Sequence, residues 1–298
     1  MSIARTTSKE PERSRKCSAA LLAGVGIAVV VIGGCTSGDS AQVIEDVIAN
    51  TASHYQVLDL TTGTITPEGS IDDLASNPVY RNDKMVFRLV PAGTAQLGTA
   101  TGSTFPAEAD EAATSQAINR FYLAVYEITQ AQWQHLDETT PWSDVTVAEE
   151  IGDLTPAAER PAYGLSLSAV QRVLDAMRTK HDVVCDLPTD AQWEYACRAG
   201  SNGLYAWGDS RNASVAGRYA AVSETRRADS GPWTVGTGTP NGYGLYDLHG
   251  NIWEWTSDGQ IRGGSWFDPV SLARAANKAQ VAADQPHMLV GARLVYRP

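Results

Sequence analysis

The sequence predicts a single α+β domain, residues 85–298, in which loops outnumber regular elements. Three observations support this prediction. Short runs of alternating or β-branched residues, separated by turns, predict strands. Hydroxyl residues three positions before a glutamine predict the N-termini of helices. The segment 241–266 fits neither pattern, because it holds six glycines and three tryptophans. Glycine permits tight bends and indole supplies buried area, so we predict an ordered but irregular segment of the core.

The predicted strands are short. Residues 85–90 alternate between apolar and polar side chains, Pro91–Gly93 turn the chain, and residues 94–98 return. Three further strands are expected at residues 121–128, 183–188 and 291–296.

The helix starts share one signature, a hydroxyl N-cap followed three residues later by glutamine, and they are expected at Thr129, Ser168 and Thr189. The third helix has the clearest pattern. Trp193, Ala196 and Cys197 fall on one helical face, and Gly200 is the expected stop.

The first 35 residues differ from the rest of the chain. A basic stretch of net charge +3 precedes 17 uncharged residues, Ser18–Gly34, and Cys35 follows Gly33 and Gly34 directly. This arrangement is typical of an export signal, and it resembles a bacterial lipoprotein signal peptide in which Cys35 becomes the lipidated first residue. The alternative is an uncleaved signal anchor. Both place the remainder outside the cytoplasm, on a membrane facing the periplasm or exterior.

Residues 36–84 are rich in threonine, serine, glycine and aspartate, and we interpret them as a tether or linker. A short β-hairpin within Tyr55–Ile65 is the alternative.

Without residues 1–35 the chain has 18 basic and 32 acidic residues, a net charge of −14. Such a surface repels phosphate backbones, so nucleic acid is excluded as an expected partner. Cys185 and Cys197 remain; an exported protein could pair them, but two buried free thiols are an equally good interpretation.

Several motifs resemble the formylglycine-generating enzyme (sulfatase-modifying factor) family. They are Val90–Thr94, Tyr126–Gln132, Leu187–Gly200, Tyr205–Asp209, Asn241–Trp266, its final part Arg262–Trp266, and Gly291–Arg293, where Ala292 replaces the family's phenylalanine. The resemblance covers Met85–Pro298. It implies a formylglycine-generating-enzyme-like, C-type-lectin-like fold with much irregular structure.

The resemblance also implies where catalysis would lie. The family's oxidases hold Cu(I) with two cysteines just after Gly-Gly-Ser, because thiolates are soft ligands. The matching positions in this chain are Asp268 and Ala273, so we expect no catalytic residues of that type, no copper and no formylglycine-generating activity. The histidines are scattered and predict no iron site. We interpret His249 as a structural hydrogen-bonding residue.

Calcium is the metal that the resemblance still implies. By the family's pattern Asp247 and Glu254 supply carboxylates, and Gly250 and Ile252 supply backbone carbonyls. The alternative is that Glu254 is a buried, internally satisfied carboxylate and Asp247 a turn cap.

The C-terminal segment also resembles the variable proteins of diversity-generating retroelements, some of them lipoproteins. Arg274–Lys278 and Gly291–Arg293 match their markers. The residues between the markers form a candidate recognition face: Phe267, Asp268, Val270, Leu272, Val281, His287 and Met288. The alternative is an ordinary family C-terminus whose side chains fill the core.

The sequence therefore predicts an exported, lipid-anchored protein whose non-catalytic domain binds an extracytoplasmic protein or small ligand. A diversified display protein is the more specific form of this prediction. A sulfatase-modifying-factor-type enzyme or accessory factor with different chemistry is the rival hypothesis. A purely structural envelope protein is the third.

Overall fold

The computed structural model describes residues 18–24, 27–33, 54–100, 102–103, 105–144, 154–225 and 231–298, the first two ranges by their backbone only. The chain divides into two compact units, residues 1–52 and residues 53–298.

The described residues of the first unit form an antiparallel hairpin. Strand β1 (Ser18–Gly24) pairs with β2 (Ile27–Gly33) along their whole length. Cys35, the predicted lipidation site, lies outside the described residues. Within the described ranges, no helix combines the length and the apolar content that crossing a bilayer requires.

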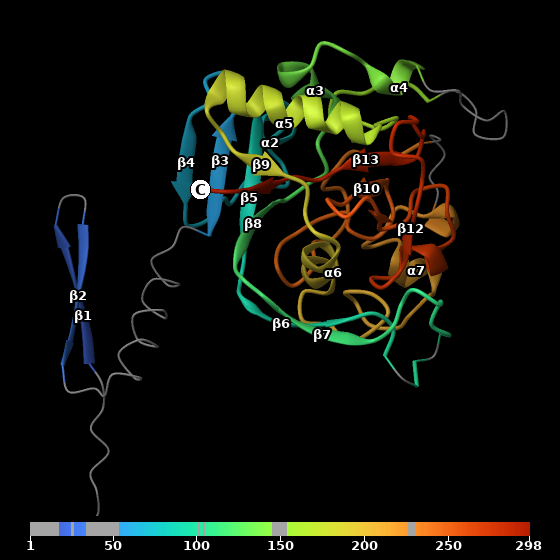
Figure 1. Cartoon of the computed structure of the whole chain (residues 1–298), viewed down its shortest axis with the longest axis horizontal. Coiled ribbons are helices and arrows are strands. Elements are labelled where there is room, and N and C mark those ends of the chain that lie inside the picture. The colour runs from blue at the N-terminus through green and yellow to red at the C-terminus, as the bar shows by residue number, and fades with distance from the viewer. Residues whose placement is uncertain are drawn as a thin grey trace, which may run out of the picture. The chain divides into compact units, whose positions relative to one another are not determined.

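The second unit is built on a six-stranded sheet in the order β4-β3-β5-β8-β14-β9 (Figure 1). Its strands are β3 (Tyr55–Asp59), β4 (Ile65–Glu68), β5 (Lys84–Val90), β8 (Phe121–Ala124), β9 (Cys185–Asp186) and β14 (Val295–Tyr296).

The start of the domain is a correction to the sequence prediction. Strand β3 pairs with β5 from Tyr55 to Asp59, and Leu58 is fully buried in the main core. Residues 54–84 are therefore part of the domain and not a tether, and the hairpin alternative for this region is confirmed. Sparse apolar content concealed these strands, because β4 sits at the sheet edge with three of its four residues exposed.

The helices confirm most of the capping prediction. They are α2 (Val79–Asn82), α3 (Gln130–Leu136), α4 (Pro141–Asp144), α5 (Leu167–His181), α6 (Asp190–Arg198) and α7 (Ala213–Ala216), with 3-10 turns η1 (Ser223–Thr225) and η2 (Val270–Ala273). Thr129 and Thr189 each form a complete capping box. The cap predicted at Ser168 is wrong, because Ser166 caps α5 through a bond from the Ala169 N–H. Helix α5 lies across one end of the domain beside α3 (Figure 1) and buries one face in the main core.

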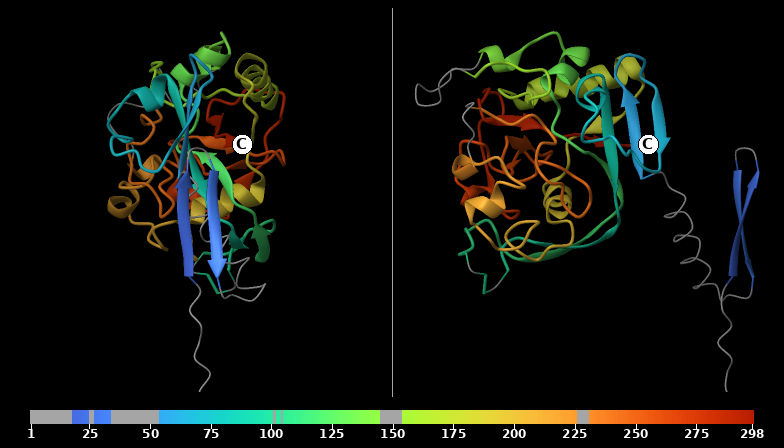
Figure 2. Two further views of the ribbon diagram at one scale, coloured as in Figure 1. Left: turned by 90° about the vertical axis from the view of Figure 1, so that its left-hand side faces the viewer. Right: turned by 180° about the vertical axis from the view of Figure 1, so that it is seen from behind.

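The predicted return of the chain after Val90 is also wrong. Strand β6 (Gly93–Leu97) pairs with β7 (Thr114–Ile118), which the sequence did not predict, and not with β5. The two form a separate curved ribbon that runs along α6 (Figures 1 and 2). Four of the five β7 residues are exposed, so the strand lacks the apolar alternation that would have revealed it.

A second sheet has the order β12-β11-β10-β13. Its strands are β10 (Trp253–Trp255), β11 (Ile261–Arg262), β12 (Lys278–Ala279) and β13 (Val290–Ala292). The single closing strand predicted at residues 291–296 is in fact two strands, since β13 lies in this sheet and β14 in the other. The C-terminal residues thus connect both sheets.

Candidate functional site

The glycine- and tryptophan-rich segment forms the centre of the loop-rich half of the domain. Trp253, Trp255 and Trp266 are buried, which confirms that they pack in the core. Asp247 and Asn251 adopt positive φ angles of 60° and 65°. The Asn251 side chain holds this bend: it accepts a bond from the Trp233 N–H (2.8 Å) and donates to Glu127 (3.0 Å).

The carboxylate of Glu254 is engaged by two side chains. Oε1 accepts from Nη2 of Arg293 at 2.8 Å, and Oε2 accepts from Nε1 of Trp193 at 2.6 Å. Arg293 is itself fully buried and also donates to the backbone carbonyls of Ala124 and Val125. This ion pair joins β10 to the chain that follows β13 and to β8.

Two further carboxylates lie near the same arginine. Glu127 is fully buried, and its Oε2 accepts no hydrogen bond among the described residues, with Nη2 of Arg293 3.7 Å away. Burial and the charge of Asp247 raise the pKa of Glu127 well above its usual range. Burial likewise raises the pKa of Asp247 to about 6, although its Oδ2 accepts a 2.6 Å bond from the Gly236 N–H. Three buried carboxylates thus face one guanidinium.

The hydrogen bonds and ion pairs of these carboxylates bear on the predicted calcium ligands Asp247, Gly250, Ile252 and Glu254. Glu254 is an internally satisfied carboxylate, as the alternative reading had it, so it is a poor ligand. The carboxyl groups in excess of the one guanidinium are Asp247 and Glu127, and their raised pKa values show that no cation in the described residues fully offsets their charge. No group of three or more His, Cys, Asp or Glu side chains in the described ranges has a metal-binding arrangement. For Asp247, Gly250 and Ile252 calcium binding stays a prediction.

The positions that match the oxidase cysteines hold no thiol. Oδ2 of Asp268 accepts bonds from Trp253 Nε1 (2.8 Å) and Ser265 Oγ (2.5 Å). Ala273 is fully buried. The cysteines in the described ranges, Cys185 and Cys197, are both buried and unpaired, and burial raises the pKa of Cys185 to about 12. Burial raises the pKa of Cys197 as well. Such protonated thiols are weak metal ligands.

The candidate recognition segment is partly surface and partly core. Residues 282–287 are exposed, and His287 is among them. Asp268 is half-buried, as are four apolar residues that pack one side against the core, Phe267, Leu272, Val281 and Met288. Val270 is a correction: it is only 5% exposed and packs in a small cluster with Leu204 and Tyr205, so it cannot contact a ligand.

His249 has the structural role that the sequence predicted. Its Nδ1 lies 2.7 Å from the Ala273 carbonyl, and its Nε2 accepts from the Ala206 N–H at 3.0 Å. The ring is therefore neutral, and burial lowers its pKa to about 4.

Sequence reasoning missed Glu127, Arg293 and Trp193 as partners of the central segment. One signal was available, because Glu127 follows an apolar strand in a buried position and a buried carboxylate requires a cation or a donor. The sequence does not show which cation Glu127 meets, because Arg293 lies far along the chain. Its bond to the Val125 carbonyl, for example, joins residues 168 positions apart.

The geometry defines a formylglycine-generating-enzyme-like domain of C-type-lectin-like fold. Residues 71–298 match the model of the sulfatase-modifying factor enzyme 1-like domain, and the chain belongs to this family. It is 28% identical over 214 residues to the formylglycine-generating enzyme of Bos taurus, which covers 57% of this chain and 56% of that protein. The chain thus spans about half the length of the first curated relatives it matches. It is also 38% identical over 97 residues, 28% of this chain and 32% of that protein, to inactive C-alpha-formylglycine-generating enzyme 2 of Mus musculus.

Solved structures share the fold at low identity. Treponema denticola variable protein 1 superposes with a TM-score of 0.60 and 18% identity, covering 72% of this chain and 96% of that chain. PvdO from Pseudomonas aeruginosa gives a TM-score of 0.59 and 21% identity, covering 72% and 94%.

Proposed function

We propose that this protein is an exported binding protein whose domain has no formylglycine-generating activity and recognises a ligand through residues 267–290. One observation carries the proposal. At the positions of the family's thiol pair, Asp268 is bound by two fixed donors and Ala273 is buried. Neither position can supply a thiolate for copper.

Two relatives support a binding role. The first is inactive C-alpha-formylglycine-generating enzyme 2. The second is Treponema denticola variable protein 1, which has the same fold. The half-buried side chains of the segment suit recognition, because their inner sides are held by the core while their outer sides stay available.

The recognition face is tested by placing a photo-crosslinking amino acid at position 287 in the native host. Position 138, an exposed glutamate elsewhere on the surface, is the matched control. The proposal expects one recurrent adduct from position 287 that Phe267→Ala and Met288→Ala weaken without lowering the melting temperature by more than a few degrees. No adduct, or the same adduct from position 138, would contradict it.

We also propose that calcium stabilises the 247–252 bend. The surplus of buried carboxylates supports this, since a cation there would offset the raised pKa of Asp247. Calcium titration is expected to raise the melting temperature of the wild-type chain and not that of Asp247→Asn. Equal responses in the two proteins would reject the site.

The sequence of the N-terminal residues supports a proposal for where the protein is located in the cell. A lipid on Cys35 would anchor the protein to a membrane, facing the periplasm or exterior. Metabolic labelling with palmitate is expected to mark the wild-type chain but not Cys35→Ser. Labelling that survives the substitution would exclude this anchor.

A diversified display protein is the more specific version of the binding role. The fold likeness to a variable protein favours it. A reverse transcriptase gene and a near-copy of the 3′ end beside this gene would support display. The enzyme alternative would need a metal or cofactor of a different kind, and stoichiometric copper or iron in the native protein would favour it.

A further inference from the structure

Two asparagine–glycine pairs occur in the sequence, Asn202–Gly203 and Asn241–Gly242. In such a pair the backbone nitrogen of the glycine can attack the side-chain amide of the asparagine, because glycine has no Cβ that obstructs the approach. The attack requires an asparagine side chain that can turn toward the residue that follows it. The structure allows this rotation at the first pair and opposes it at the second.

The Asn202 side chain is exposed, and its amide forms no hydrogen bond within the described part of the chain. The N–H of Gly203 donates to Oγ of Ser201 at 3.1 Å. This bond joins neighbouring residues and leaves the Asn202 side chain unrestrained. The amide carbon of Asn202 can therefore approach the Gly203 nitrogen by rotation about its side-chain bonds.

The Asn241 side chain, in contrast, is held by hydrogen bonds at both of its polar atoms. Nδ2 donates to the carbonyls of Ala196 (2.8 Å) and Cys197 (3.2 Å). Oδ1 accepts from the N–H groups of Tyr243 (2.9 Å) and Leu245 (3.2 Å). Attack on this amide would first have to break these bonds, so the fold protects Asn241 from the same reaction.

The backbone that follows Asn202 is tightly packed, which gives the reaction a structural consequence. A Cβ built on Gly203 would lie 2.8 Å from Cα of Gly208. The Gly203 carbonyl accepts a 2.9 Å bond from Nη1 of Arg198. An additional backbone atom at this point would therefore force the loop to shift.

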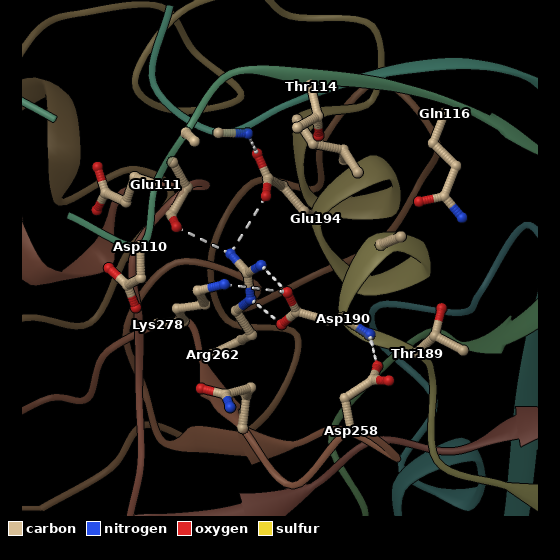
Figure 3. A pocket seen from close by; sticks show the side chains of 16 residues that line it. Asp110, Glu111, Thr114, Gln116, Thr189, Asp190, Glu194, Asp258, Arg262 and Lys278 are labelled. Atoms are coloured by element: carbon tan, nitrogen blue, oxygen red, sulfur yellow. Dashed lines mark hydrogen bonds and ion pairs between the residues drawn. The ribbon is translucent and has the colours of Figure 1, made fainter. Parts of the chain in front are cut away.

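Arg198 connects this loop to the wall of a cavity. Its Nη2 donates to the Gly98 carbonyl and to Oε1 of Glu194, each at 2.7 Å. Oε1 of Glu194 also accepts from the Gly98 N–H at 2.7 Å, and Glu194 lines the cavity beside the β6–β7 ribbon (Figure 3). A shift at Gly203 would thus disturb, through Arg198, the contacts at the end of β6.

We propose that Asn202 is a site of deamidation, with water as the co-reactant, and that the isoaspartate product destabilises the loop 201–209. The Gly203 nitrogen forms a bond to Cγ of Asn202 and loses its proton, while the side-chain nitrogen leaves as ammonia. Water then opens the cyclic imide at either of its carbonyl carbons. One opening gives aspartate, and the other gives isoaspartate, which adds one carbon to the backbone. This site is independent of the recognition segment proposed above.

Peptide mapping by mass spectrometry tests the proposal on the purified full chain after several weeks at 37 °C. The peptide that contains Asn202 is expected to convert to aspartate and isoaspartate, and faster at pH 9 than at pH 7, because the attacking nitrogen must lose its proton. Asn241 is the control within the same molecules. Its conversion is expected to be at least about tenfold slower in the folded chain, because its amide is hydrogen-bonded. In urea, where these bonds are lost, the two sites are expected to react at similar rates.

Two variants separate the reaction from its structural effect. Asn202→Gln is expected to resist the reaction, because its longer side chain forms a ring less readily, and to keep the wild-type melting temperature. Asn202→Asp carries the new charge on an ordinary backbone and is expected to melt like the wild type as well. The isoaspartate fraction of the aged wild type is expected to melt several degrees lower.

An Asn202 that stays intact in the folded chain while it converts in urea would overturn the proposal. So would equal rates at Asn202 and Asn241 in the folded chain, because the hydrogen bonds of Asn241 would then give no protection. An isoaspartate fraction with an unchanged melting temperature would overturn the predicted effect on the loop.

Discussion

His249 makes the stability of this domain depend on pH in a way that one substitution can isolate. In the folded protein burial lowers its pKa from 6.5 to about 4. Between these values the unfolded chain binds a proton that the folded protein does not, so stability is lost as the pH falls. A shift of this size corresponds to about 3 kcal/mol between pH 7.5 and pH 4.

The perturbation is His249→Asn, which removes the titrating group and the acceptor for the Ala206 N–H. At pH 7.5 the variant is expected to be about 2 kcal/mol less stable, the cost of a buried donor left without its partner. The difference between wild type and variant should shrink as the pH falls, vanish near pH 5 and be reversed by about 1 kcal/mol at pH 4, because only the wild type loses the histidine contribution.

Urea unfolding followed by tryptophan fluorescence at pH 7.5, 6, 5 and 4 measures this difference directly. His135→Asn is the matched control, since that side chain is 29% exposed and pairs with the surface residue Asp83. Taking differences between proteins cancels groups that titrate in both, including Asp247, whose raised pKa acts in the opposite direction. A difference that stays constant across the series would refute the assignment of a buried neutral ring.

Two further predictions concern the central segment. Arg293→Met leaves Glu254 buried without its cation and is expected to lower the free energy of unfolding by roughly 3–5 kcal/mol; a variant of wild-type stability in urea would contradict the ion-pair account. Gly250→Ala is expected to cost at least about 2 kcal/mol, because Gly250 has φ +81° and an added Cβ would collide with the Ala221 carbonyl. Gly69→Ala, where nothing lies within 4 Å and φ is ordinary, is the control and should be nearly neutral by thermal unfolding; equal losses at the two positions would show that the bend is not constrained.

The helices were predictable because their signals are local. A capping box needs only four consecutive residues, and Thr129 and Thr189 form one as the sequence indicated. The cap predicted at Ser168 was wrong because Ser166, two residues earlier, is also a hydroxyl residue that can cap the helix. The position of the apolar face of α5 decides which of the two serines is the N-cap. Local patterns thus identify the helices but leave their first residues uncertain.

The strands and the charged cluster depended on contacts that no local pattern shows. Strands β4 and β7 carry few apolar residues, so their pairing partners reveal them better than their own sequences do. The burial of Val270 and the pairing of Glu254 with Arg293 likewise follow from packing between distant segments. Family motifs located the central segment correctly, but they did not show that Glu254 is already satisfied by the protein.

The central claim is that this domain retains the family fold without its thiol chemistry. The most direct test is to incubate the purified chain with copper, oxygen and a peptide that carries the sulfatase cysteine motif, and to follow the peptide by mass spectrometry. With Asp268 and Ala273 at the thiol positions, we expect an unchanged peptide and no copper bound to the chain. Conversion of the peptide cysteine to formylglycine, at a rate above that of copper alone, would contradict it.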